Sequence, residues 1–83
     1  MVNLRREYLK LSDLKKGDRA IIKRIDADES LKKRLASFGV GKGSELIVET
    51  CSIGKKTFEI IVDGTMIAIR GEEAKRVEVE KIN

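Results

Sequence analysis

The dipeptide Asp63–Gly64 is the sequence feature that most constrains how this chain folds. It lies between two apolar segments, since Phe58, Ile60 and Val62 alternate with less apolar neighbours and residues 66–70 return on the other side. A two-residue type I′ turn needs positive φ at both positions, and Asp-Gly is one of the pairs that adopts it most readily. The sequence therefore predicts an antiparallel hairpin across residues 58–70.

Three further segments have the composition of short strands. Residues 19–25 are rich in isoleucine, Leu46 and Val48 are two apart, and a last strand carries Val77, Val79 and Ile82. Closing such a sheet removes its exposed edges. We therefore expect a mainly β fold, a small and partly open barrel of about five strands. The alternative is a split α+β sheet with a helix on one face.

Residues 28–38 are the only segment with sustained helical spacing. Leu31, Leu35 and Phe38 fall at positions i, i+4 and i+7, which places them on one inward face. Asp28 or Ser30 is expected to cap the start, and Gly39 to supply the left-handed residue after the end. The fold thus has one longer helix, after the first strand.

Shorter turns complete the pattern. Residues 11–18 are expected to form one helical turn, with Ser12 as its N-cap, Leu11 and Leu14 facing inward and Gly17 ending it. Residues 71–74 are expected to form another turn. We divide the chain into a lead-in segment, residues 1–10, and one barrel domain, residues 11–83.

Missing residue types limit the chemistry open to this chain. It has no histidine and one cysteine, Cys51. Ser-His-Asp and Cys-His catalytic arrangements are therefore impossible, and a Cys/His zinc site cannot be assembled. We expect no enzyme activity, no cofactor and no tight metal site. The longest apolar run is four residues, Met66–Ile69, so no segment resembles a membrane span or an export signal.

Basic residues are concentrated in the first part of the chain. Residues 1–50 carry 12 basic and 8 acidic side chains, and residues 51–83 carry six of each. Lys23, Arg24 and residues 32–34 form a candidate basic patch, which is most often a solvated face, with an acidic partner as the alternative. Nucleic-acid binding is not expected, because few aromatic side chains are present for stacking. Abundant Lys, Arg, Glu and Ile with little Asn and no Gln resembles a thermophile's composition.

Three other candidate sites have simpler interpretations. The loop of residues 39–44 is not a Walker A motif, because Ala36 and Gly43 stand where a glycine and a Ser or Thr are required. We interpret it as a helix C-cap and a tight turn. Cys51 is expected to be a packing residue. The acidic pair Glu72–Glu73, with Asp63, offers oxygen ligands to a hard cation, but capping of a turn is the commoner role.

Several motifs together resemble the ferrous iron transport protein A (FeoA) family. Residues 11–17 match L-x-x-L-x-x-G, residues 34–40 resemble R-L-x-x-L-G-aliphatic, Gly43 precedes a strand, and residues 64–70 match G-x-x-[IM]-A-[LI]-R. The resemblance covers about residues 9–82. Lys42 stands where the family often has proline, and Phe38 replaces a common leucine.

The resemblance implies an SH3-like domain and a cytoplasmic, non-enzymatic role in ferrous iron uptake. Its implied partner is the cytosolic region of the FeoB-type membrane transporter, with membrane contact only through that partner and a weak homo-oligomer left open. The alternative is a metal-responsive module, as in iron-dependent repressors. The predicted contact residues lie on the helix, the following loop and a late strand: Lys33, Arg34, Val40, Lys42, Ile67 and Arg70.

Overall fold

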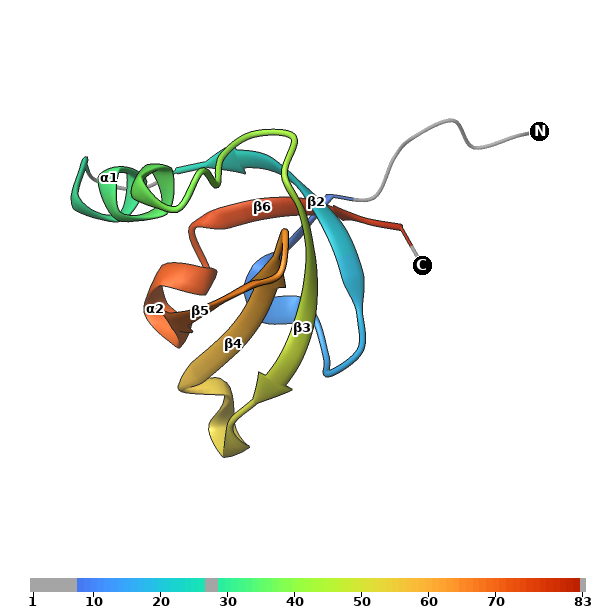
Figure 1. Cartoon of the computed structure of the whole chain (residues 1–83). Coiled ribbons are helices and arrows are strands. Elements are labelled where there is room, and N and C mark those ends of the chain that lie inside the picture. The colour runs from blue at the N-terminus through green and yellow to red at the C-terminus, as the bar shows by residue number, and fades with distance from the viewer. Residues whose placement is uncertain (1–7, 27–28, 83) are drawn as a thin grey trace.

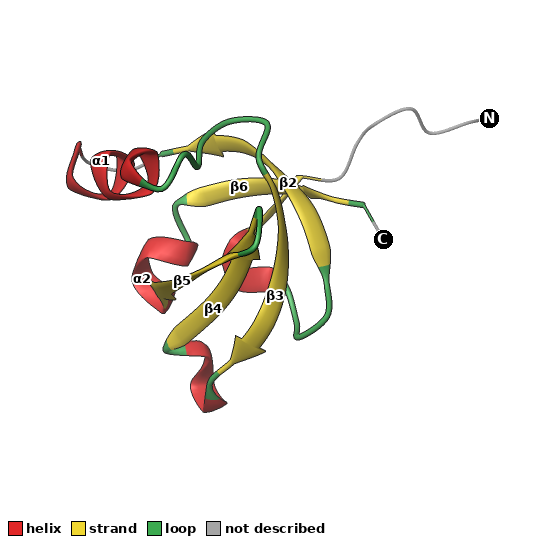
Figure 2. Ribbon diagram, viewed as in Figure 1, coloured by secondary structure: helices red, strands yellow, loops and turns green. Residues whose placement is uncertain are grey.

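The computed structural model describes residues 8–26 and 29–82, and its main feature is one antiparallel sheet (Figure 1). The strands are β1 (Tyr8–Lys10), β2 (Arg19–Ile25), β3 (Glu45–Cys51), β4 (Thr57–Val62), β5 (Thr65–Arg70) and β6 (Val77–Lys81). The helices are α1 (Glu29–Ser37) and the single turn α2 (Gly71–Ala74), with 3₁₀ turns η1 (Leu11–Asp13) and η2 (Ile53–Lys55). Figure 2 shows α1 lying beside the sheet rather than across it.

The strands follow the order β1-β6-β2-β3-β4-β5, so the last strand lies between the first two. Both β1 and β2 pair with β6 antiparallel. Within the described residues, β1 and β5 are edge strands and do not pair with each other. The sheet is therefore not closed, which confirms the expected mainly β, partly open architecture.

A sixth strand is the first difference from the expected fold. Residues 8–10, assigned above to a lead-in, form β1, with Leu9 opposite Val79 and Lys10 opposite Glu78. Leu9 packs against the core. Three residues are too few to show the alternation that identifies a strand, so the pairing comes from the tertiary contact with β6. Residues 1–7 lie outside the described part of the chain.

One aliphatic core lies on the inner face of the sheet. Along β4 the buried positions are Phe58, Ile60 and Val62, and along β5 they are Ile67 and Ile69. No polar or charged residue among those described is buried. The predicted alternation is therefore confirmed, and so is the hairpin: Asp63 has φ 51° and Gly64 has φ 80°.

Helix α1 ends at Ser37, one residue before the last residue that its apolar spacing suggests. Leu31 and Leu35 are buried, but Phe38 is 50% exposed, so its predicted place in the core is wrong. Gly39, with φ 77°, reverses the chain direction, and the N–H groups of Gly39 and Val40 donate to Ala36 and Leu35 at 2.9 Å. This is a Schellman motif, in which the residue after the glycine packs back against the helix. Val40, at 4% exposure, takes the core position.

Two smaller expectations also change. The turn after β1 is the 3₁₀ turn η1, and its backbone cap is Asp13 Oδ2, which accepts from Lys10 N at 2.9 Å, in place of the expected Ser12. Leu11 and Leu14 are buried as predicted. At the other end, β6 stops at Lys81 and Ile82 is 36% exposed. At the start of α1, Ser30 lies inside the helix, and the candidate cap Asp28 lies outside the described residues.

Candidate partner-binding surface

Helix α1 presents three different faces. Leu31 and Leu35 point into the core. Successive helical side chains are about 100° apart, so Lys32 and Ala36 share one flank and Arg34 lies on the other. The three consecutive cations Lys32, Lys33 and Arg34 therefore lie on different sides of the helix.

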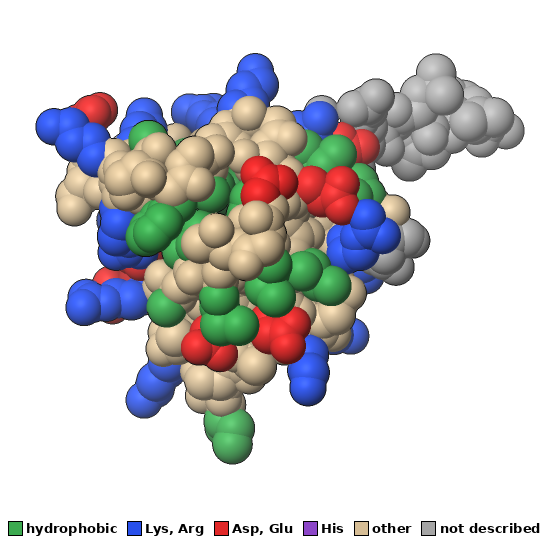
Figure 3. All heavy atoms as spheres, viewed as in Figure 1, with side chains coloured by type: hydrophobic (Ala, Val, Ile, Leu, Met, Phe, Trp, Pro, Cys, Tyr) green, Lys and Arg blue, Asp and Glu red, His purple; other side chains and the backbone are tan. Residues whose placement is uncertain are grey.

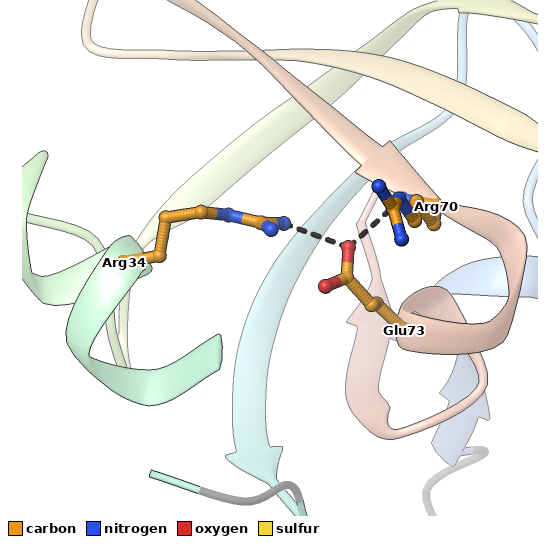
Figure 4. Close-up of polar contacts among 3 residues, drawn as sticks. All are labelled: Arg34, Arg70 and Glu73. Atoms are coloured by element: carbon orange, nitrogen blue, oxygen red, sulfur yellow. Dashed lines mark hydrogen bonds and ion pairs between the residues drawn. The ribbon is translucent and has the colours of Figure 1, made fainter. Parts of the chain in front are cut away.

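On the Arg34 flank, α1 is joined to α2 by a single carboxylate. Arg34 Nη2 donates to Glu73 Oε1 at 2.7 Å, and the backbone N–H of Arg70 donates to the same oxygen at 3.0 Å (Figure 4). The Arg34 hydrogen bond, followed by the Arg70 backbone hydrogen bond and the positive charges, lowers the pKa of Glu73, although partial burial opposes the shift. Glu73 therefore caps α2, as expected, and also holds α1 in place.

The two predicted contact surfaces are therefore neighbours. Arg34, from the helix, and Arg70, from the end of β5, both meet Glu73. Arg34 is exposed, and its guanidinium is paired with a carboxylate that lies 39 residues later in the sequence.

The other predicted contact residues divide by burial. Val40 and Ile67 are 4% and 3% exposed, so both belong to the core and their side chains offer no contact surface as they stand. Alternation explains Ile67, since Met66 and Ala68 face outward, and the Schellman motif explains Val40. Lys33 and Lys42 are exposed. Their role as partner contacts stays a prediction.

On the other flank of α1 lies an open groove of about 440 Å³, which we call the α1–β2 groove. It runs between α1, the end of β2 and the loop that follows α1. Its lining residues are Lys23, Arg24, Ile25, Lys32, Ala36, Val40, Gly41 and Lys42. Figure 3 shows Lys and Arg side chains projecting around the α1 end of the molecule.

The cations of the α1–β2 groove differ in their partners. Lys23 Nζ lies 3.1 Å from Glu80 Oε1. Within residues 8–26 and 29–82, Arg24, Lys32 and Lys42 form no ion pair. The sequence grouped Lys23, Arg24 and Lys32 in one basic patch, and the structure confirms that they share a surface. It adds Lys42 and the apolar Ile25 and Ala36 to that surface. Of these three, only Ala36 follows from the helical spacing, because it lies four residues after Lys32 on the same flank of α1.

The loop of residues 39–44 is the predicted C-cap and tight turn. Ser44 Oγ accepts from Gly41 N at 3.0 Å, and Gly43 N donates to Ile22 O at 2.7 Å. This second contact fixes the loop against β2. The loop therefore forms one wall of the α1–β2 groove.

A second hollow, of about 770 Å³, lies between η1, η2 and α2. It carries mixed charges, with Asp13 and Glu72 beside Lys55, Lys56, Arg70 and Lys75. Lys55 Nζ donates to Ser12 O at 3.1 Å. Gly71 also lines this hollow, and its N–H donates to Lys56 O at 2.8 Å. Its charges balance each other more evenly than those of the α1–β2 groove.

The remaining candidates from the sequence are Cys51, a metal site and a membrane span. Cys51 is partly buried and packs against the core, as predicted. Across the residues that the structure describes, no three His, Cys, Asp or Glu side chains gather as a metal site would require. None of the described helices is long and apolar enough to cross a bilayer.

Comparison with known proteins identifies the family. The sequence model of the FeoA domain matches residues 9–81. The chain belongs to the FeoA domain family. Its Schellman motif, the Asp63–Gly64 turn and the strand that ends at Arg70 are therefore the structural form of the motifs that carried the resemblance.

Two relatives are similar to most of this chain. A proposed Fe(2+) transport protein A of Campylobacter jejuni is 38% identical over 72 residues, which are 87% of this chain and 97% of that protein. A protein of Porphyromonas gingivalis, named as a fusion of Fe(2+) transport protein A with the Fe(2+) transporter FeoB, is 28% identical over 75 residues. The match covers 90% of this chain and 9% of the fusion protein.

Solved structures agree on the fold. The FeoA protein from Chlorobium tepidum has a TM-score of 0.84 at 29% identity, covering 90% of this chain and 71% of that one. A manganese-dependent transcriptional repressor has a TM-score of 0.83 at 22% identity, covering 94% of this chain and 44% of the repressor. The second likeness shows a shared fold alone.

Proposed function

We propose that this chain is a non-enzymatic, cytoplasmic accessory of ferrous iron uptake that acts by contact with the FeoB-type transporter. The observation that carries the proposal is the Porphyromonas gingivalis fusion, in which a region similar to nearly all of this chain is joined covalently to FeoB. Joining two proteins in one chain raises their effective concentration toward each other, which is useful when the separate proteins must meet.

The surface of the chain supports a binding role. Three cations without ion-pair partners among the described residues line a groove with an apolar floor, while Arg34 and Glu73 fix the helix beside it. Such a surface suits recognition of another protein, in which polar groups at the rim give register and an apolar centre gives affinity. A bound accessory shifts a transporter's equilibrium only by its difference in affinity for the two states.

A binding measurement tests the proposal. The chain and the cytosolic region of the FeoB-type transporter from the same source are mixed and titrated by calorimetry, and we expect saturable, stoichiometric binding. In cells that lack this chain but keep the transporter, uptake of radiolabelled ferrous iron should change when the chain is restored. Absence of binding together with unchanged uptake would contradict the proposal.

The metal-responsive alternative rests on likeness to the repressor, which extends to the fold and no further. We therefore do not adopt it. Direct titration with Fe(II), described below, separates the two functions.

A further inference from the structure

We propose that the α1–β2 groove is the site that holds the partner, and that its occupant is an acidic segment of protein with an apolar side chain at its centre. This inference rests on the proposed function, because it specifies which surface meets the transporter and what chemistry the transporter must offer. Of the two hollows described above, the α1–β2 groove is the one in which the cations of the described lining face apolar groups with no acidic side chain among them.

The charge of the groove is one-sided. Among the described residues, its lining contains four cationic side chains, Lys23, Arg24, Lys32 and Lys42, and no acidic one. The nearest acidic residues in the sequence are Asp26, after β2, and Glu29, at the start of α1, and neither lines the groove. Only Lys23 is neutralised within the described residues, by Glu80 at 3.1 Å. The groove therefore carries an uncompensated positive potential, which attracts carboxylates and speeds their encounter with the site.

The apolar floor of the groove places a second requirement on the segment that binds there. The reachable apolar groups of the floor are Ile25, which is half-buried, and Ala36, which is exposed on α1. Val40 also lines the groove but is only 4% exposed. An occupant that is acidic throughout would leave these apolar groups facing charge. A segment with Leu, Ile or Phe between Asp and Glu residues would bury the floor and pair with the cations at the rim, which is the usual anatomy of a protein interface.

Concavity favours a peptide over an anionic membrane. A bilayer surface is flat over the dimensions of this domain, so it would touch the exposed lysines but leave the floor uncovered. The volume of about 440 Å³ is toward the lower end of the range for ligand sites and is large enough to admit apolar side chains of a peptide. The walls are fixed, since Gly43 N donates to Ile22 O at 2.7 Å and Arg34 anchors α1 from behind.

The first test uses a synthetic probe. A short peptide with Asp and Glu on both sides of a Leu-Leu pair is compared with a peptide in which Asn and Gln replace every acid, and binding is followed by fluorescence anisotropy. We expect the acidic peptide to bind at least tenfold more tightly, and the difference to shrink as salt is added. Equal binding of the two peptides would overturn the inference.

Charge-reversal variants locate the site. Lys32→Glu with Lys42→Glu should weaken the acidic peptide and the transporter's cytosolic region at least tenfold. The matched control, Lys56→Glu with Lys75→Glu at the other hollow, changes the formal net charge equally, from +4 to 0. It should weaken binding by less than threefold. Ala36→Phe, which fills the groove without altering charge, should also block binding, and unchanged binding by this variant would overturn the inference.

The outcomes separate this inference from the proposed function. If the transporter's region binds the unmodified chain and the Lys32→Glu/Lys42→Glu variant equally, the groove is the wrong surface but the proposed function stands. If the acidic peptide binds through the groove while the transporter's region does not bind at all, the proposed function fails and the acidic-segment site stands. Binding of phosphatidylglycerol vesicles without binding of the acidic peptide would overturn the inference in favour of a lipid surface.

Discussion

At Glu73, one carboxylate oxygen accepts hydrogen bonds from two parts of the chain. Arg70 N, at the start of α2, and the guanidinium of Arg34, on α1, both donate to Oε1. Charge-assisted hydrogen bonds are stronger than neutral ones, but the Arg34 side chain is 41% exposed and solvent screens the pair. The contact therefore contributes modestly to stability and mainly fixes where α1 lies.

We expect Arg34→Met to destabilise the domain by about 0.5–1 kcal/mol, because it removes the ion pair but keeps much of the side chain's apolar length. Lys33→Met is the matched control, since Lys33 is exposed and has no ion-pair partner among the described residues. Chemical denaturation of both variants measures the difference. Equal free energies of unfolding would contradict the role assigned to the Arg34–Glu73 contact.

The same contact predicts a dependence on pH. The pKa of Glu73 is lowered in the folded protein, chiefly by Arg34, so its contribution is fully present above the ordinary value of 4.5 and disappears as pH falls through the lowered value. Arg34→Met should therefore lose less stability than the unmodified protein when pH falls below about 4.5. The Asp18 pKa is also lowered, mainly by the Lys15 backbone N–H, so some acid sensitivity should remain. Denaturation curves at neutral and acidic pH provide the comparison.

Gly71 gives a sharper prediction at the residue scale. A Cβ atom there would lie 2.2 Å from the carbonyl oxygen of Lys55, which belongs to the backbone and cannot simply rotate away. We expect Gly71→Ala to cost about 1–3 kcal/mol, as overpacking usually does. Gly41→Ala is the control, because no heavy atom lies within 4 Å of its added Cβ. A thermal melt in which both variants match the unmodified protein would show that η2 and α2 are not in such close contact.

At the scale of elements, the end of α1 depends on Gly39. Its φ of 77° lies in the left-handed region, where a β-branched residue is strained, although no heavy atom lies near an added Cβ. We expect Gly39→Val to lower the free energy of unfolding by about 1–2 kcal/mol. Lys42→Ala, in the same loop, should have little effect. Equal melting temperatures for the two variants would contradict the position of the helix end.

Alternation made most of the sheet predictable from sequence. In β2 to β6 the buried side chains lie two residues apart, and the hairpin turn is specified by its own two residues. Strand β1 was not predictable, because three residues show no period and pair with a strand some 70 positions later. Phe38 has helical spacing but lies just after the last helical residue, and the reversal at Gly39 places Val40 in the core in its stead.

The candidate site was predictable only where it follows the helix. Lys32 and Lys33 are placed outward by their phase relative to Leu31 and Leu35, and the structure agrees. Arg34 and Glu73 lie 39 residues apart in the sequence, so no local sequence pattern predicts that they pair. The α1–β2 groove likewise needs the tertiary position of β2, although three of its four cations were already recognised as part of a basic patch.

At the scale of the whole molecule, charge and composition lead to a prediction about metals. The chain has no histidine, and the described acidic residues do not gather in groups of three or more. Fe(II) sites usually draw on histidine and carboxylate ligands. Anaerobic calorimetry with Fe(II) on the reduced, tag-free chain should show no site tighter than micromolar. A stoichiometric nanomolar site within one monomer would contradict this and restore the metal-responsive function.

The position of β6 between β1 and β2 has a consequence for how the chain is made. During synthesis, strands β2 to β5 leave the ribosome in an order that lets each pair with the next, because they are neighbours in both sequence and sheet. Until Val77–Lys81 has emerged, β1 has no strand to pair with, and the core lacks Val77 and Val79. Strand β2 therefore keeps an unpaired edge until the last described strand inserts between β1 and β2, which both precede it in the chain.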